Sequence, residues 1–162
     1  MGKKVRHSGR GGKTIRLLKE ERAFVGIDVH KDSYSVSVAA DRRKVVARWV
    51  QPADPLAVVR RLEPIRSQVA AVVYEAGPTG FSLVRVLREH GLPADVVAPS
   101  KTPTERGPAG KSDRLDADDL AFLASKAMLR AIYVPTRQEE ADRQLVRRRH
   151  AILSRREVVY AA

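Results

Sequence analysis

Two acidic residues stand where buried strands are expected, and they are the first sign of chemistry in this sequence. Asp28 follows the apolar run at 23–27, and Glu75 ends a second apolar run at 69–75. A carboxylate inside a central strand is costly unless a partner compensates its charge. If the two strands are parallel neighbours, both acids lie at the carboxyl ends, where open α/β sheets place their sites. The alternative for Glu75 alone is a strand-end charge in water.

A second group of acids lies in the segment GKSDRLDADDLA, residues 110–121. Asp113 and Asp116 are three residues apart, so they share one face of the helix that is expected to begin there. Asp116 is also in line with Leu120 and Leu123, which form the apolar stripe expected to face the sheet. The spacing therefore predicts that Asp116 points toward the edge of the sheet.

Capping of this helix is the competing explanation, because acids in a first turn interact favourably with the helix dipole. Capping accounts well for Asp113 as the N-cap, adequately for Asp118, and poorly for Asp116. Asp119 lies nearer the edge of the apolar stripe and is the best substitute ligand if one of the other acids does not serve.

Four carboxylates that converge repel one another unless cations lie between them. Because every donor is an oxygen, the expected cation is Mg²⁺ or Mn²⁺ and not zinc. Pairs of such metals activate a nucleophile and stabilise the leaving oxygen in phosphodiester chemistry. Basic residues around the acids are expected to hold phosphates: Lys31, Lys101, Arg106, Lys111 and Arg114.

The elements that must position these acids follow from the hydrophobic pattern. Continuous or alternating apolar runs predict strands at 23–29, 34–38, 44–50, 69–75 and 94–99. Helical spacing predicts helices at 54–65, 83–90 and 113–129, then a charged helix from 137 to the end. The first three strands have links too short for crossovers, so they form an antiparallel meander. The expected fold is α/β, a five-stranded mixed sheet with helices on both faces, in the element order of the ribonuclease H fold.

Charge divides the chain into three parts. The net charge is +12, and residues 1–22 hold eight Lys/Arg against two acids in a glycine-rich stretch, which predicts a basic disordered tail. Residues 23–135 form the folded domain. Residues 136–162 form the start of a coiled-coil helix, because the apolar pairs at 145–146, 152–153 and 159–160 recur every seven residues. Basic ends predict a nucleic-acid partner.

Composition excludes several classes of protein. The chain has no cysteine, so disulfides and thiolate metal sites are excluded. No apolar run approaches the length of a membrane span, and no apolar segment follows the basic start as in a secretory signal. The expected location is the cytoplasm, with no membrane partner.

Three segments together resemble a known family. GIDVHKD at 26–32, YEAGPTG at 74–80 and KSDRLDADDLA at 111–121 are similar to the DEDD transposases of bacterial insertion sequences, which include the pilin-gene invertase and the bridge-RNA-guided recombinases. The resemblance implies a RuvC-like domain for DNA transposition and recombination. It implies that the catalytic metal ligands are Asp28, Glu75, Asp113 and Asp116. It also implies DNA and guide RNA as partners, and the C-terminal helix predicts a homo-oligomer.

The resemblance also implies something beyond these motifs. Members of the family continue through a coiled coil into a second domain that supplies a nucleophilic serine. Ser100, Ser112 and Ser125 are interpreted instead as loop, cap and helix-surface residues. The expectation is therefore a truncated transposase, or one reading frame of a split gene, that binds metal and nucleic acid without completing strand exchange.

Three other functions remain open. A stand-alone nuclease or Holliday-junction resolvase needs only the acids and the metal. A non-catalytic fragment would bind nucleic acid or dimerise without turnover. An actin-like ATPase or sugar kinase shares the meander core, but the short length and the lack of a second matching half argue against it.

Overall fold

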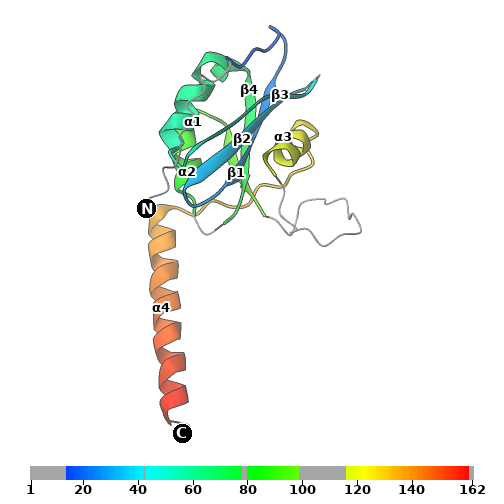
Figure 1. Cartoon of the computed structure of the whole chain (residues 1–162). Coiled ribbons are helices and arrows are strands. Elements are labelled where there is room, and N and C mark those ends of the chain that lie inside the picture. Colours follow the sequence, from blue (N-terminus) through cyan, green and yellow to red (C-terminus); the bar gives the residue numbers. More distant parts are fainter. Residues whose placement is uncertain (1–13, 42, 78–79, 99–115, 161–162) are drawn as a thin grey trace, which may run out of the picture. The chain divides into compact units, whose positions relative to one another are not determined.

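The fold is taken from a computed structural model of the chain, which describes residues 14–41, 43–77, 80–98 and 116–160. The chain forms two compact units, residues 1–132 and residues 133–162. Figure 1 shows the elements of the first unit. They are β1 (Ala23–Val29), β2 (Ser33–Ala40), β3 (Arg43–Pro52), α1 (Pro55–Leu62), a 3-10 helix (Glu63–Gln68), β4 (Val69–Glu75), α2 (Ser82–Glu89), β5 (Ala94–Val97) and α3 (Ala117–Ser125).

The five strands form one mixed sheet in the order β3-β2-β1-β4-β5. β1 pairs antiparallel with β2 and β2 with β3, so the predicted meander is confirmed. β4 returns parallel to β1 and β5 parallel to β4, which confirms the mixed sheet. Figure 1 shows α1 and α2 on one side of the sheet and α3 on the other. This arrangement is consistent with the ribonuclease-H-like fold that the element order predicted.

Helix α3 is shorter than the predicted helix at 113–129. Its N-cap is Asp116, whose backbone is extended, so the first helical residue is Ala117. Its end is fixed by Ala127, which adopts a left-handed conformation with φ of 53°. The amides of Ala127 and Met128 donate to the carbonyls of Ala124 and Leu123 at 3.1 and 3.0 Å, as in a Schellman ending. Glycine usually takes this position, so the sequence pattern did not show where the helix stops.

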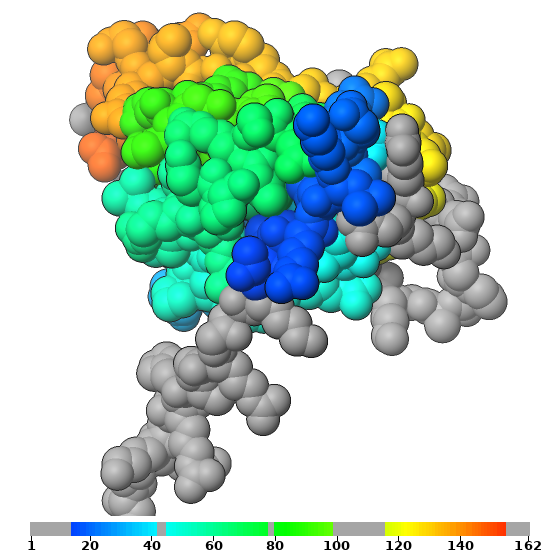
Figure 2. Space-filling model, turned by 90° about the horizontal axis from the view of Figure 1, so that it is seen from above, coloured from blue at the N-terminus to red at the C-terminus, as the bar shows by residue number. Residues whose placement is uncertain are grey.

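Residues 14–22 pack against the rest of the first unit, which differs from the prediction that residues 1–22 are disordered. The side chains of Ile15 and Glu21 are buried, and Glu21 accepts a hydrogen bond from the Leu18 amide. The Gln68 amide donates to the carbonyls of Leu18 and Glu21 at 2.8 and 2.9 Å. Figure 2 shows this segment in dark blue, lying on the green surface of the unit. The side chain of Gln68, 47 residues from Glu21 in the sequence, supplies this attachment. The composition of residues 1–22 alone could not reveal it.

Gly26 sets the distance between α3 and the sheet. A Cβ at this position would lie 2.1 Å from the Ala117 carbonyl oxygen and 2.6 Å from the Ala121 nitrogen. The helix backbone therefore rests directly on the backbone of β1, which only glycine permits. Beside this contact, Leu120 and Leu123 pack with Val73 and Val97 to form the apolar cluster under the helix. The start of α3 is thus fixed above β1 at Gly26, which is two residues before Asp28 on the same strand.

The second unit contains α4 (Arg137–Tyr160). A capping box begins it, because the Thr136 hydroxyl accepts from the Glu139 amide at 3.2 Å and the Glu139 carboxylate accepts from the Thr136 amide at 2.7 Å. The helix start therefore agrees with the predicted one. Its apolar residues Leu145, Val146, Ile152 and Leu153 are exposed. Of the helices that the structure describes, none is long and apolar enough to cross a bilayer.

Candidate functional site

Asp28 and Glu75 stand at the same level on neighbouring strands. β1 and β4 are parallel with Ile27 opposite Tyr74, so the next residue on each strand is one of the two acids. Alternate residues of a strand face the same side. Gly26 lies under α3, and Val73 packs against α3, so both acids belong to the face of the sheet that α3 covers. The sheet therefore brings the first two predicted acids to one edge of one face.

The carboxylate of Asp28 is mostly buried and has a basic partner. Its side chain is 17% exposed, and Oδ2 lies 2.9 Å from Nε2 of His30. Because the two residues are two apart at the end of β1, they point to the same side. His30 lies in the short link between the first two strands and was not among the predicted site residues, although its spacing of two from Asp28 was the available signal.

Glu75 is buried, with only 5% of the residue exposed. The alternative that it is a strand-end charge in water is therefore wrong. Its position is protected because β4 has neighbours on both sides, β1 and β5, and Glu75 itself pairs with Val97. A carboxylate buried at the end of a central strand is a strong candidate for binding a cation.

The residue before Glu75 anchors the helix that follows. The Tyr74 hydroxyl accepts from the Val84 amide at 3.3 Å and lies 3.4 Å from the Gly80 carbonyl, to which it can donate. Burial raises the pKa of Tyr74 to about 12, so the hydroxyl keeps its proton. Phe81, the N-cap residue of α2, makes no side-chain capping bond, so Tyr74 serves in place of a cap.

Tyr74→Phe is expected to lower the free energy of unfolding by about 1–2 kcal/mol, because it leaves the buried Val84 amide without an acceptor. Urea denaturation followed by circular dichroism measures this change. The matched control is Tyr34→Phe, since Tyr34 is also buried but its hydroxyl makes no hydrogen bond to the described residues. Equal losses in the two variants would show that Tyr74 does not cap α2.

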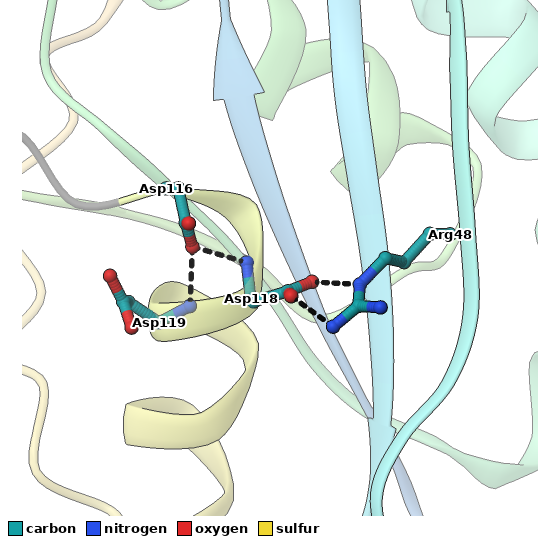
Figure 3. A network of polar contacts seen from close by, with 4 residues as sticks. All are labelled: Arg48, Asp116, Asp118 and Asp119. Carbon is teal, nitrogen blue, oxygen red and sulfur yellow. Dashed lines mark hydrogen bonds and ion pairs between the residues drawn. The ribbon is translucent and has the colours of Figure 1, made fainter.

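Asp116 is the N-cap of α3, a role that the sequence analysis assigned to Asp113. Oδ1 of Asp116 accepts from the amides of Asp118 and Asp119, both at 2.9 Å, as Figure 3 shows. The expectation that capping explains Asp116 poorly is therefore wrong, because the N-cap lies three residues later than the predicted cap, Asp113. Asp116 is exposed, and both of these bonds end on the same oxygen. Oδ2 thus takes no part in these two capping bonds.

Asp118 lies in the first turn of α3, as the predicted dipole contact requires, and has a further role. Its two carboxylate oxygens accept from Nε and Nη2 of Arg48 on β3, with the Nε bond at 2.7 Å. Hydrogen bonding to Arg48 lowers the pKa of Asp118, so its carboxylate stays charged. By contrast, partial burial and then the charge of Asp116 raise the pKa of Asp119. The first turn of α3 therefore holds crowded negative charge, of which only Asp118 is neutralised by an arginine in the described residues.

The structure describes only some of the remaining predicted site residues. Lys31 is exposed just after β1. Asp113, Lys101, Arg106, Lys111 and Arg114 lie outside the described residues, as do Ser100 and Ser112. Among the described residues, no three acidic or histidine side chains lie close enough together to hold a metal ion. A pocket of about 130 Å³ lies between β4, β5 and the end of α3, but its lining includes none of the candidate acids.

Comparison with known proteins gives a consistent result. Residues 25–159 match the IS110-type family of DEDD transposases, described as transposase. A protein of Sinorhizobium fredii named as a transposase, y4qE, is 39% identical over 144 residues, which are 86% of this chain and 36% of the relative. The transposase for insertion sequence element IS1533 of Leptospira borgpetersenii is 26% identical over 137 residues, 82% of this chain and 40% of the relative. The chain thus spans well under half the length of these curated relatives.

Proposed function

Since the chain belongs to the IS110-type family of DEDD transposases, we propose that its first unit is a RuvC-like domain that binds a divalent cation and nucleic acid for the transposition of an insertion sequence. The proposed metal ligands are Asp28, Glu75, Asp113 and Asp116. One observation carries this proposal. Asp28 and Glu75 occupy equivalent positions on adjacent parallel strands, under the helix whose N-cap is Asp116.

The chemistry of these residues fits Mg²⁺ or Mn²⁺. All the donors are carboxylate oxygens, and Mg²⁺ is usually held by one or two carboxylates, with water and phosphate oxygens completing its shell. Carboxylates at the ends of neighbouring strands suit that requirement. When bound, such a cation polarises a phosphoryl oxygen and makes water or a hydroxyl a better nucleophile.

The chain's own residues have separate tasks in this proposal. Asp28 and Glu75 are held rigidly by the sheet and orient the cation against the phosphate. Asp116 presents Oδ2 while its other oxygen keeps the helix start in place. His30 holds the Asp28 carboxylate in the absence of the cation, since Nε2 of His30 and a cation would compete for the same oxygen.

The proposed partners are DNA and a guide RNA, as in the bridge-RNA-guided and pilin-invertase-like members of the family. The net charge of +12 supports a polyanion partner. Contacts to phosphates are proposed for Lys31, Lys101, Arg106, Lys111 and Arg114. Homo-oligomers are proposed to form through a coiled coil of α4, supported by the exposed pairs Leu145–Val146 and Ile152–Leu153, which are seven residues apart. The proposed location is the cytoplasm.

Deleting residues 1–13 is expected to weaken binding to duplex DNA and to flatten its salt dependence, because the deleted segment carries five Lys/Arg and no acid. Each phosphate contact that is lost reduces the slope of log K against log salt by about 0.9. The fold should be unchanged, since the deletion leaves Ile15 and Glu21 in place. Filter binding between 50 and 300 mM salt, together with thermal unfolding, measures both effects.

The matched control for this deletion is a chain of full length in which the same five residues are glutamine. It should bind as weakly as the deletion, because the effect depends on charge and not on length. Full-length protein that binds neither duplex DNA nor structured RNA at 50 mM salt would refute the proposed nucleic-acid function. An unchanged salt slope in both variants would exclude the basic start from the interface.

A further inference from the structure

Arg48 and Asp118 join two elements that are 70 residues apart in the sequence. Arg48 lies on β3, an edge strand of the sheet, and Asp118 lies in the first turn of α3. Nε of Arg48 binds Oδ1 of Asp118, and Nη2 binds Oδ2, so both oxygens of the carboxylate are engaged (Figure 3). This two-point geometry fixes direction as well as distance, which a single ion pair does not do.

The pair lies on the opposite side of α3 from its apolar contacts. Leu120 and Leu123 hold the helix over β4 and β5, where they meet Val73 and Val97. Gly26 provides a close backbone contact over β1. The pair between Arg48 and Asp118 holds the other flank, over β2 and β3. Three contacts across the sheet therefore determine how the first turn of α3 is rotated.

That rotation also determines where the Asp116 carboxylate lies. Oδ1 of Asp116 is held by the backbone amides of Asp118 and Asp119, which belong to the same turn. A side chain bound to two amides follows those amides when the turn moves. The position of Oδ2 is therefore linked to Arg48 through Asp118.

We propose that Arg48 is a positioning residue of the metal site, which holds the first turn of α3 so that Asp116 meets the cation and Asp118 does not. This inference rests on the proposed function, because it assumes that Asp116 is a metal ligand. Arg48 does so in two ways. It fixes the turn through a two-point contact. It also occupies both oxygens of Asp118, which is two residues from Asp116 and would otherwise compete with it for the cation.

The test compares Arg48→Met with Arg60→Met. Arg60 also pairs with an acid at a helix start, Asp54 of α1, at 3.0 Å, on the other side of the sheet. Isothermal calorimetry of the full chain with Mn²⁺ should show a dissociation constant about ten-fold weaker for Arg48→Met, as for other groups that orient metal ligands. Arg60→Met should bind Mn²⁺ as the parent chain does. Asp118→Asn should weaken binding in the same direction as Arg48→Met.

A second measurement separates positioning from general destabilisation. Amide exchange followed by nuclear magnetic resonance without metal should be faster at Asp118 and Asp119 in Arg48→Met, and unchanged there in Arg60→Met. Unchanged exchange, or unchanged Mn²⁺ affinity, in Arg48→Met overturns the positioning role. A parent chain that binds no Mn²⁺ instead refutes the metal site of the proposed function. The two failures are thus distinguishable.

Discussion

Replacing Gly26 with alanine is expected to destabilise the first unit by about 3 kcal/mol or more, which is at the upper end of overpacking in a core. The new methyl group would lie 2.1 Å from the Ala117 carbonyl oxygen and 2.9 Å from Cβ of Leu120. These neighbours are helix backbone and a buried side chain, so they cannot move without shifting the helix. Thermal unfolding should show a melting temperature lower by roughly 10 °C or more.

Gly77→Ala is the matched control for this substitution. Among the residues that the structure describes, its added Cβ would meet only the Glu75 carbonyl oxygen, at 3.9 Å, which is an ordinary contact. We expect its melting temperature to stay within about 2 °C of the parent chain, as for surface changes that break no contact. If Gly26→Ala unfolds at the same temperature as Gly77→Ala, then α3 does not rest on β1. The placement of Asp116 near the strand ends would fail with it.

Asp28→Asn is expected to abolish most of the stabilisation that Mg²⁺ or Mn²⁺ gives to the parent chain. A ligand that binds only the native state stabilises it by about 2.7 kcal/mol at one hundred times its dissociation constant. Loss of the Asp28 charge removes a proposed ligand that lies at the end of β1, in the middle of the sheet. Differential scanning calorimetry with 0–10 mM MnCl₂ measures the change, and Glu75→Gln should behave in the same way.

The matched control for these two variants is Asp95→Asn. Asp95 is an acid of the same sheet, on β5, but it pairs with Arg88 at 2.8 Å and is not a proposed ligand. Its variant should keep the full response to Mn²⁺, whatever its effect on stability without metal. A full response in Asp28→Asn would remove Asp28 from the site. A response that is lost in Asp95→Asn as well would show non-specific binding to acids.

The order and direction of the strands could be predicted from the sequence. The links around residues 30–32 and 41–43 are too short for a crossover, so the first three strands had to be antiparallel. The helical segment at 54–65 allowed the strand at 69–75 to return parallel to the first. Because side chains alternate along a strand, this topology already placed Asp28 and Glu75 near one another. Local pattern and chain connectivity were sufficient for this half of the site.

The start and end of α3 could not be predicted from the pattern. Acids at 113, 116, 118 and 119 all suit the first turn of a helix, so their types did not show which one is the cap. The cap is Asp116, and the helix that it begins rests on β1 at Gly26. At the other end, Ala127 takes a conformation that usually needs glycine, so the apolar spacing seemed to continue to 129.

Contacts between distant residues were decided only by the tertiary structure. No spacing rule links Arg48 to Asp118, or Gln68 to Leu18 and Glu21, because these partners meet only after the sheet has formed. The burial of Glu75 likewise depends on having strands on both sides of β4. The sequence by itself determined which acids lie at the strand ends, since alternation and link length act locally. The tertiary structure decided which of the remaining acids caps the helix and which is bound by arginine, since those roles depend on how α3 packs across the sheet.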